Sequence, residues 1–270
     1  MKVRAPATSA NLGPGFDCAA VALDLWNELE VTDGAGVVVE GEGAGELPED
    51  ETNLAVLAYA LVAPTDGRRF RFVNRIPVER GLGSSAAAIA LGLVAAGPGR
   101  TAADLLALGG ALESHQDNLG AALTGGACIT WHGRIAKVAQ TLPLQPVAVI
   151  PATRTVTEAA RGALPPTISH EDGAFTAAHA ALLGAGLAAG SAEWLTLALE
   201  DRLHEPYRPS ALLAEIRAEL PTRAAGATLS GSGPTVLVWA RDSERCAAAL
   251  ADRYPEHRVL RLSVAPRGAL

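Results

Sequence analysis

The chain has 270 residues, 49% of them hydrophobic, and a formal net charge of -7 at pH 7. This apolar fraction predicts a globular protein with a packed core, in one large domain or in two smaller domains that share a cleft. The negative charge disfavours a general nucleic-acid binder and a protein of anionic membranes, because both need a basic surface.

The sequence carries no sign of a membrane or secretory protein. It has no stretch with the length and apolar character of a transmembrane helix, and its amino terminus lacks the apolar core of a signal peptide. We therefore expect a cytoplasmic protein without membrane or nucleic-acid partners. Cys18, Cys128 and Cys246 lie far apart without paired spacing, which indicates buried thiols rather than a disulfide framework or a zinc site.

In the amino-terminal half, short strand-like runs alternate with helical patterns. A helix is predicted from Ser84, with Ser84 or Ser85 as its N-cap. Another helix is predicted over 101–113, with Thr101 as N-cap and Asp104 completing a conservative variant of the capping box. The expected strands are 3–5, 27–32, 37–40, 69–74 and 127–131.

A boundary between two lobes is predicted near Pro143 and Pro146, where proline interrupts the pattern before a new strand. We therefore divide the chain into 1–143 and 144–270. Helical patterns dominate the second part before its last strands, which indicates an α+β domain whose antiparallel sheet is covered by helices. Its expected helices are 175–188, 192–204, 210–220 and 243–254, and its expected strands are 147–150, 227–229, 235–239 and 258–263.

The most informative segment is 80–88, Arg-Gly-Leu-Gly-Ser-Ser-Ala-Ala-Ala. Gly81 and Gly83 allow positive φ angles and a close approach of the backbone to a ligand. The first-turn amides of the following helix and the positive end of its dipole favour a bound anion, usually a phosphate. A plain tight turn before a capped helix is the alternative.

Common nucleotide and nucleophile motifs are absent from this segment. No Gly-Lys-Ser/Thr follows as in a Walker loop, and no third glycine completes a dinucleotide-binding pattern. A Gly-x-Ser-x-Gly nucleophile elbow is also missing. Since Lys2 and Lys137 are the only lysines of the sequence, no lysine is placed to imitate that of a P-loop.

Three further segments carry groups suited to a ligand. Residues 5–17 read as a small, polar loop in which Asn11 and Asp17 supply an amide and a carboxylate, as needed to hold a hydroxyl and an ammonium group. Residues 113–118, Glu-Ser-His-Gln-Asp-Asn, concentrate ionisable and amide side chains at a helix end; a solvated helix end is the alternative. Residues 226–235 join two strands with more glycines than a hairpin loop needs.

Together these segments resemble the GHMP kinase superfamily, and the segment Pro77-x-x-x-Gly81-Leu82-Gly83-Ser84-Ser85-Ala86 is similar to its phosphate loop. The resemblance implies two α+β lobes with the site between them. The amino-terminal lobe is expected to be like the second domain of ribosomal protein S5, and the carboxy-terminal lobe to be ferredoxin-like.

Within the superfamily, the chain resembles the homoserine kinase family. This similarity rests on residues 8–17 in combination with Glu113-x-His115-x-Asp117-Asn118, and it is strengthened by Thr157, Arg161 and residues 205–208. Ser114 and Gln116 depart from the Gly and Pro of many relatives. The resemblance implies ATP- and Mg²⁺-dependent phosphorylation of the L-homoserine hydroxyl to O-phospho-L-homoserine, for threonine biosynthesis in the cytoplasm. A homodimer is left open.

For ATP, the resemblance implies binding of the phosphates by backbone amides in place of a lysine. Mg²⁺ prefers hard oxygen ligands and keeps several waters. Ser85 and Glu113 match the positions of its few protein contacts, with Ser84 as the alternative to Ser85. The expected nucleotide-binding residues are Pro77, Arg80, Gly81, Leu82, Gly83, Ser84, Ser85, Ala86 and Ala87.

For homoserine, a small zwitterion with one hydroxyl, the resemblance implies three kinds of contact. Arg161 and Arg208 match a carboxylate clamp. Asp17 and Asp117 are the candidate ammonium acceptors. The remaining expected groups are Asn11 and Asn118 for the hydroxyl, Thr157 for the arginine or the substrate, and Gly231 of the glycine-rich turn.

Homoserine kinases resemble one another in lacking the catalytic aspartate of some superfamily members. The resemblance therefore implies direct in-line transfer, in which the substrate proton passes towards the γ-phosphate. A loose transition state permits this, since positioning and charge neutralisation then carry most of the catalysis. His115 is the alternative base. The expected catalytic residues are Asn11, His115, Asn118 and Arg161.

Two other functions stay open from the sequence: a related kinase of mevalonate, shikimate or another alcohol, and a non-catalytic sensor that binds its ligand without turnover. The presence of Ser85 and Glu113 favours a kinase over a sensor. Because mevalonate and shikimate carry a carboxylate but no ammonium group, the expected ammonium site at Asp17 and Asp117 favours an amino-acid substrate.

Overall fold

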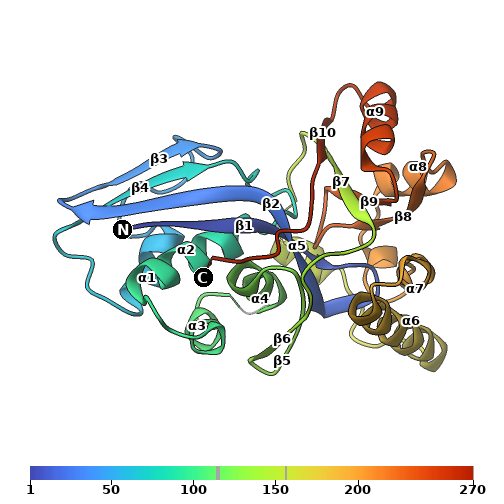
Figure 1. Cartoon of the computed structure of the whole chain (residues 1–270), viewed down its shortest axis with the longest axis horizontal. Coiled ribbons are helices and arrows are strands. Elements are labelled where there is room, and N and C mark those ends of the chain that lie inside the picture. Colours follow the sequence, from blue (N-terminus) through green and yellow to red (C-terminus); the bar gives the residue numbers. More distant parts are fainter. Residues whose placement is uncertain (114–115, 156, 270) are drawn as a thin grey trace.

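The computed structural model describes residues 1–113, 116–155 and 157–269. They form two sheets with helices packed against them, one towards each end of the long axis of the molecule (Figure 1). The expected two-lobed α+β architecture is therefore confirmed. Within the described residues, no helix is both long enough and apolar enough to cross a membrane.

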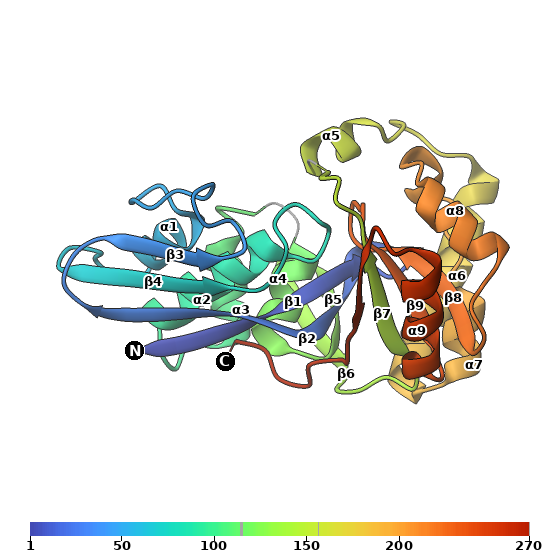
Figure 2. The ribbon, with the colours of Figure 1, turned by 90° about the horizontal axis from the view of Figure 1, so that it is seen from above.

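The first sheet has the strand order β3-β4-β2-β5-β6, and β1 pairs with β2 beside this path. The long strand β2 joins the sheet together, because it pairs with β1, β4 and β5. Helices α1 to α4 gather on one side of this sheet (Figures 1 and 2). The elements are β1 (Lys2–Asn11), β2 (Gly15–Asp33), β3 (Val37–Gly41), α1 (Leu54–Ala60), β4 (Arg68–Asn74), α2 (Ser84–Ala96), α3 (Ala102–Gly109), α4 (Gln116–Thr124), β5 (Ala127–Trp131) and β6 (Arg134–Ala139).

Helix α2 lies at the centre of this lobe. Its sequence, Ser-Ser-Ala-Ala-Ala-Ile-Ala-Leu-Gly-Leu-Val-Ala-Ala, is apolar on every side, as expected for a helix that is surrounded by other elements. It contacts α1, α3 and α4 as well as β1 and β2. A Cβ at Gly92 would collide with the Ala55 carbonyl of α1, so this glycine permits close packing of the two helices.

The second sheet has the strand order β10-β7-β9-β8, and every neighbouring pair is antiparallel. A helical segment connects β7 to β8, β8 and β9 form a hairpin, and α9 leads to β10. This order is that of a ferredoxin-like βαββαβ unit, as predicted. The elements are β7 (Gln145–Ile150), α5 (Thr157–Gly162), α6 (His170–Ala189), α7 (Ala192–Ala198), a short 3₁₀ turn η1 (Glu205–Tyr207), α8 (Ala211–Ala218), β8 (Ala224–Leu229), β9 (Val236–Ala240), α9 (Ser243–Arg253) and β10 (Arg258–Arg261).

The second sheet is covered on both faces. Val147 and Val149 of β7 belong to a hydrophobic cluster with residues of α8 and α9. Ala148, between them, belongs to the main core together with Leu183 of α6 and Leu195 of α7. Because successive strand residues point to opposite faces, a strand with helices on both sides is apolar throughout. This explains the uninterrupted apolar run of β7.

The carboxy-terminal end of the chain returns to the first sheet. Val264 forms an isolated bridge with Leu23 of β2, and the Ala265 amide donates to the Ala22 carbonyl at 2.9 Å. The strands of the two sheets lie on either side of residue 143, but these last residues pair with the first lobe. The division into 1–143 and 144–270 stays a prediction.

Several predicted boundaries were wrong. The capping box at Thr101 is confirmed, but α3 ends at Gly109 rather than 113. The helix expected over 192–204 ends at Ala198, since a turn held by Asp201 follows it. Residues 5–17 were expected as a loop and mostly form strands. Cys18 is only half-buried, whereas the other two cysteines are buried as expected.

Candidate active site

A cavity of about 420 Å³ lies between the two lobes. Strand ends of the first sheet, the loop before α2 and the start of α4 form one side of it, and the segments around α5, η1 and the β8–β9 turn form the other. Thirteen of the predicted site residues line it. They are Asn11, Asp17, Arg80, Gly81, Gly83, Ser84, Ser85, Glu113, Asp117, Asn118, Arg161, Arg208 and Gly231.

The glycines of the loop before α2 are required by their surroundings. Gly81 and Gly83 have φ angles of 73° and 67°. A Cβ on Gly81 would collide with the Ser230 carbonyl, and a Cβ on Gly83 would collide with the Thr8 hydroxyl. Ser230 also donates from its hydroxyl to the Gly81 carbonyl at 2.6 Å. The glycine-rich β8–β9 turn thus fixes the shape of this loop.

The N-cap of α2 is Gly83 and not a serine, so that prediction was wrong. An N-cap serine needs an extended backbone, whereas the chain here turns in the left-handed region, which glycine adopts without strain. No side chain caps this helix, and the Ala87 amide is the first to donate to a helix carbonyl, that of Gly83 at 2.9 Å. The amides of Ser84, Ser85 and Ala86 precede that first bond and face the end of the helix.

Four of the expected nucleotide-binding residues do not line the cavity. The side chains of Pro77, Leu82, Ala86 and Ala87 are buried in the protein. Leu82 instead supports the loop through its main chain, since its carbonyl accepts from the Thr8 amide at 3.0 Å. Side chains at these four positions therefore support the loop from the protein interior, on the side away from the cavity.

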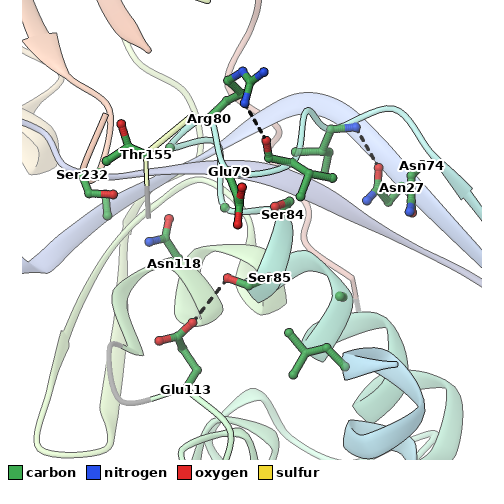
Figure 3. Close-up of a pocket in the computed structure, with 18 of the residues that line it drawn as sticks. Asn27, Asn74, Glu79, Arg80, Ser84, Ser85, Glu113, Asn118, Thr155 and Ser232 are labelled. Atoms are coloured by element: carbon green, nitrogen blue, oxygen red, sulfur yellow. Dashed lines mark hydrogen bonds between the residues drawn. The ribbon is translucent and has the colours of Figure 1, made fainter. Parts of the chain in front are cut away.

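Ser85 and Glu113, which both line the cavity, point towards each other (Figure 3). The Ser85 hydroxyl lies 3.4 Å from Oε2 of Glu113. Among the described residues, no group of three or more His, Cys, Asp or Glu is arranged to hold a metal ion. A hydroxyl and a carboxylate are hard oxygen donors, and they suit a cation that takes most of its ligands from phosphate and water.

Arg80 is bound by main-chain carbonyls. Its guanidinium donates to Pro151 at 3.0 Å, to Ala152 at 2.6 Å and to Val78 at 3.2 Å. The Thr155 amide donates to the Glu79 carbonyl at 3.1 Å. The loop before α2 is thus tied to the segment that leads from β7 to α5.

Asn11 is the last residue of β1 and Asp17 lies near the start of β2, on either side of the turn that joins the two strands, and both have positive φ angles, 73° and 56°. The Asn11 side chain accepts from the Asp17 amide at 3.2 Å and donates to the Gly231 carbonyl at 2.9 Å. The two expected substrate residues are therefore held together, and the turn is fixed to the β8–β9 turn of the other lobe.

Two arginines of the second lobe reach this turn. Nη2 of Arg161 lies 2.6 and 2.7 Å from the two carboxylate oxygens of Asp17. Arg208 is buried and donates to the Ala160 and Gly231 carbonyls at 3.3 and 3.4 Å. Its guanidinium and that of Arg161 each lie 5.4 Å from the centre of the Phe16 ring. Burial, and then the nearby Arg161 charge, lower the pKa of Arg208 from its ordinary value.

Asp117 and Asn118 lie in the first turn of α4, whereas the sequence predicted a helix end at this segment. The Asp117 carboxylate is buried and accepts from the Asn118 amide at 2.6 Å. The Asn118 side chain accepts from the Thr8 hydroxyl at 2.7 Å and faces the same space as Ser85 (Figure 3). His115 lies outside the described residues, and so does the side chain of Thr157.

The sequence did not predict the other end of the cavity. Beyond Ser84, the wall becomes apolar and carries three asparagines, in a space formed by the β3–α1 connection, β4 and α2. Its residues are Asn27, Leu47, Pro48, Asn53, Leu54, Phe72, Asn74, Ile76, Val78, Ala88 and Leu91. No local motif marks them, because they come from several elements that meet only in the fold.

The chain is similar to known proteins along its whole length. It matches the family model for the GHMP kinases N terminal domain over residues 53–126. It is 43% identical over 263 residues to a homoserine kinase of Clavibacter michiganensis subsp. michiganensis, covering 90% of this chain and 83% of that protein. A homoserine kinase of Desulfitobacterium hafniense is 36% identical over 293 residues, covering 100% of this chain and 99% of that protein.

Solved structures support the fold. A homoserine kinase from Cytophaga hutchinsonii has a TM-score of 0.86 at 24% identity, covering 100% of this chain and 96% of that one. An L. major mevalonate kinase in complex with R-mevalonate has a TM-score of 0.73 at 14% identity, covering 100% and 97%. At these identities the two likenesses show the fold alone. From its identity to the full-length relatives, the chain belongs to the homoserine kinase family of the GHMP kinases.

Proposed function

We propose that the protein transfers the γ-phosphoryl group of ATP to the hydroxyl of L-homoserine, giving O-phospho-L-homoserine for threonine biosynthesis. The observation that carries this proposal is the two-ended cavity. A helix start suited to phosphates lies at its middle, and a cluster of arginines and carboxylates lies at one end. The relatives that share the whole length of the chain are named homoserine kinases.

The two ends of the cavity favour one orientation of ATP, with the base at the apolar end and the phosphates at the start of α2. The apolar end, with Phe72, Ile76 and Leu91, suits a flat base, and its asparagine amides suit the polar edge of that base. The amides at the start of α2 then meet the phosphates, where the helix dipole favours negative charge. The γ-phosphate would thereby point to the arginine end.

The pair Ser85 and Glu113 fits Mg²⁺, because both are hard oxygen donors beside the expected phosphates. When bound, the ion would neutralise charge on the phosphates. Ser85 would hold it from the first turn of α2 and Glu113 from the segment after α3, while the helix amides bind the phosphate oxygens.

The arginine end suits a small zwitterion. Arg208 and Arg161 would bind the α-carboxylate, where charged hydrogen bonds contribute about 1.5–3 kcal/mol each. Asp17, released from Arg161, would accept from the ammonium group, and Asp117 is the second candidate for it. Asn11 and Asn118 would orient the hydroxyl towards the phosphates. Gly231 of the β8–β9 turn and Thr157 are the remaining expected substrate contacts.

Proton transfer would occur without a dedicated aspartate base. Asp17 is paired with Arg161, and the buried Asp117 carboxylate accepts from the Asn118 amide at the start of α4. These contacts favour a role of both carboxylates in binding and positioning rather than as the base. The hydroxyl proton would pass towards the γ-phosphate during direct in-line transfer, in which a loose transition state needs little activation of the nucleophile. His115 stays the alternative base.

A phosphoryl-transfer assay with L-homoserine, mevalonate, shikimate and galactose, each with Mg-ATP, tests the proposal. We expect ADP release and a new phosphomonoester only with L-homoserine. Turnover of mevalonate or shikimate instead would assign a related kinase, and ATP or homoserine binding without any turnover would assign a sensor. Sedimentation of the purified protein would test the homodimer. Its cytoplasmic location also stays a prediction.

A further inference from the structure

We infer that His204 is a positioning residue for the substrate carboxylate, because it accepts a hydrogen bond from Arg208 and holds this guanidinium at the wall of the cavity. The inference rests on the proposed function, in which Arg208 binds the carboxylate of L-homoserine. His204 itself does not line the cavity, and its side chain is fully buried.

The two ring nitrogens of His204 have fixed partners. Nε2 lies 2.9 Å from the Gly13 carbonyl, and Nδ1 lies 3.3 Å from Nη1 of Arg208. A carbonyl only accepts hydrogen bonds, so Nε2 must carry the proton. A guanidinium only donates them, so Nδ1 must present its lone pair. The two partners therefore specify the neutral ring with its proton on Nε2.

Main-chain contacts hold the turn that contains Gly13 and the turn that carries His204. Gly13 has a φ angle of 80°, and a Cβ there would lie 2.7 Å from the Leu199 carbonyl, so the β1–β2 turn packs closely against the end of α7. The buried Asp201 carboxylate accepts from the amides of residues 203, 204 and 205 at 2.8 to 3.1 Å. His204 and Arg208 flank the short 3₁₀ turn η1, and the Arg208 amide donates to the Glu205 carbonyl at 3.0 Å.

The contact closes a ring of hydrogen bonds around the arginine end of the cavity. Arg208 and Asn11 both donate to the Gly231 carbonyl, at 3.4 and 2.9 Å. Asn11 precedes the turn that contains Gly13. The Gly13 carbonyl accepts from Nε2 of His204, and Nδ1 of His204 accepts from Arg208. His204 thus links Arg208 to the turn on which Asn11 and Asp17 are placed, and its removal would leave one guanidinium edge without this support.

The electrostatic surroundings favour the neutral ring. Burial is the main cause that lowers the pKa of His204, and the Arg208 charge lowers it further, while Asp201, the Gly13 hydrogen bond and Asp17 act in the opposite direction. The Phe16 ring stacks on the imidazole at 5.2 Å between centroids. Around Arg208 the further charges are Arg161 and Asp117.

Protonation of His204 would remove the acceptor at Nδ1 and place a second positive charge beside Arg208. Because the folded pKa is lowered, this occurs only as the pH falls below the ordinary range of histidine. Affinity for a carboxylate substrate should then decrease, whereas affinity for the same molecule without its carboxylate should not change.

The test compares L-homoserine with 2-aminobutane-1,4-diol, which keeps the ammonium group and the reacting hydroxyl but carries an uncharged hydroxymethyl group in place of the carboxylate. Affinities are measured as KM, or as Ki for a poor substrate, in the wild type, H204L and H204N. H204L should raise KM for L-homoserine about ten-fold, with kcat, KM for ATP and the affinity of the diol nearly unchanged. H204N offers an amide oxygen near the position of Nδ1 and should restore most of the affinity.

A pH series from about 5 to 7.5 tests the contact in the wild type, without a substitution at His204, and is then repeated in two variants. KM for L-homoserine should rise towards low pH in the wild type and in the control variant H132N, since His132 is exposed in the β5–β6 turn. It should stay flat in H204N. The inference would be overturned if KM or Ki for the diol rose equally towards low pH, or if H204N showed the same pH profile of KM as the wild type. An unchanged KM for L-homoserine in H204L would overturn it as well.

R208A separates this inference from the proposed function. A large rise of KM for L-homoserine in R208A with no effect of H204L would overturn the role of His204 alone. An unchanged KM in R208A would mean that the carboxylate clamp itself is misassigned. If R208A and H204L each raise KM for L-homoserine, the double variant should have nearly the same KM as R208A alone, because the two residues act through one contact.

Discussion

The Arg161 guanidinium donates to both carboxylate oxygens of Asp17, at 2.6 and 2.7 Å. The proposed function assigns these two residues to opposite charges of the substrate. Both side chains are more than a third exposed, and such an ion pair contributes only about 0–1 kcal/mol. A zwitterion can therefore replace it at small cost: the substrate carboxylate becomes the partner of Arg161 and the ammonium group becomes the partner of Asp17.

Replacing Arg161 or Arg208 by Ala should raise KM for L-homoserine roughly 10- to 100-fold, since each loses a charged hydrogen bond to the carboxylate. KM for ATP should change little. Steady-state kinetics with each substrate varied in turn measure both constants. Arg202→Ala is the matched control, because Arg202 pairs with Glu171 outside the cavity. A rise in KM for ATP alone would assign the two arginines to the nucleotide.

Replacing Glu113 by Ala should lower kcat about 100-fold or more and increase the Mg²⁺ concentration needed for half-maximal activity, because the ion loses its carboxylate contact. Ser85→Ala should show the same direction with a smaller effect. Activity measured against Mg²⁺ at fixed ATP checks this. Glu49→Ala, at an exposed position, should behave as the wild type. Near-normal kinetics of both variants would remove this pair from the metal site.

Replacing Gly83 by Ala should weaken ATP binding and lower the melting temperature. Gly83 is the N-cap of α2, and its new Cβ would collide with the Thr8 hydroxyl of β1. Gly99→Ala is the control for backbone strain alone: Gly99 has a φ angle of 83° and nothing within 4 Å of its added Cβ. That control should lose only about 1–2 kcal/mol of stability. Equal melting temperatures and equal ATP affinities, by calorimetry, would contradict a specific role of Gly83.

Replacing Arg80 by Gln should raise KM for L-homoserine as well as for ATP, because the guanidinium binds the main chain that leads towards α5 and Arg161. Hydrogen exchange of residues 151–155 should become faster at the same time. Arg154→Gln is a control on that segment, since Arg154 pairs with Glu46 at 2.7 Å. An effect on KM for ATP alone would instead indicate a direct contact of Arg80 with phosphate.

Elements with a strong local signal were predicted well. The capping box at Thr101, the apolar strand β7 and the start of α9 at Ser243 all follow from neighbouring residues. Helix α4 and strand β6 were missed. Seven of the nine residues of α4 are small or polar, and its burial comes from packing against β1, β2 and β5. Long strand β2 was seen only at its end, because its first half gains its partners from β1 and β5.

The candidate site shows the same limit. Gly81, Gly83 and the serines that follow could be proposed from the sequence, as could Asn11 and Asp17. The pairing of Arg161 with Asp17 could not, since 144 residues separate them. The support of Arg208 by His204 was also missed, because only the fold brings the Gly13 carbonyl to the other nitrogen of that ring.

The sequence by itself determined the kinds of group available: a glycine-rich helix start without a lysine, a hydroxyl and a carboxylate for a cation, and arginines and aspartates for a zwitterion. Local spacing decides such features, because main-chain conformation and side-chain chemistry are properties of adjacent residues. Only the tertiary structure decided which charges meet, which arginine is exposed, and where the apolar end of the cavity lies. Those depend on contacts between distant segments of two lobes, whose energies no short stretch of the chain contains.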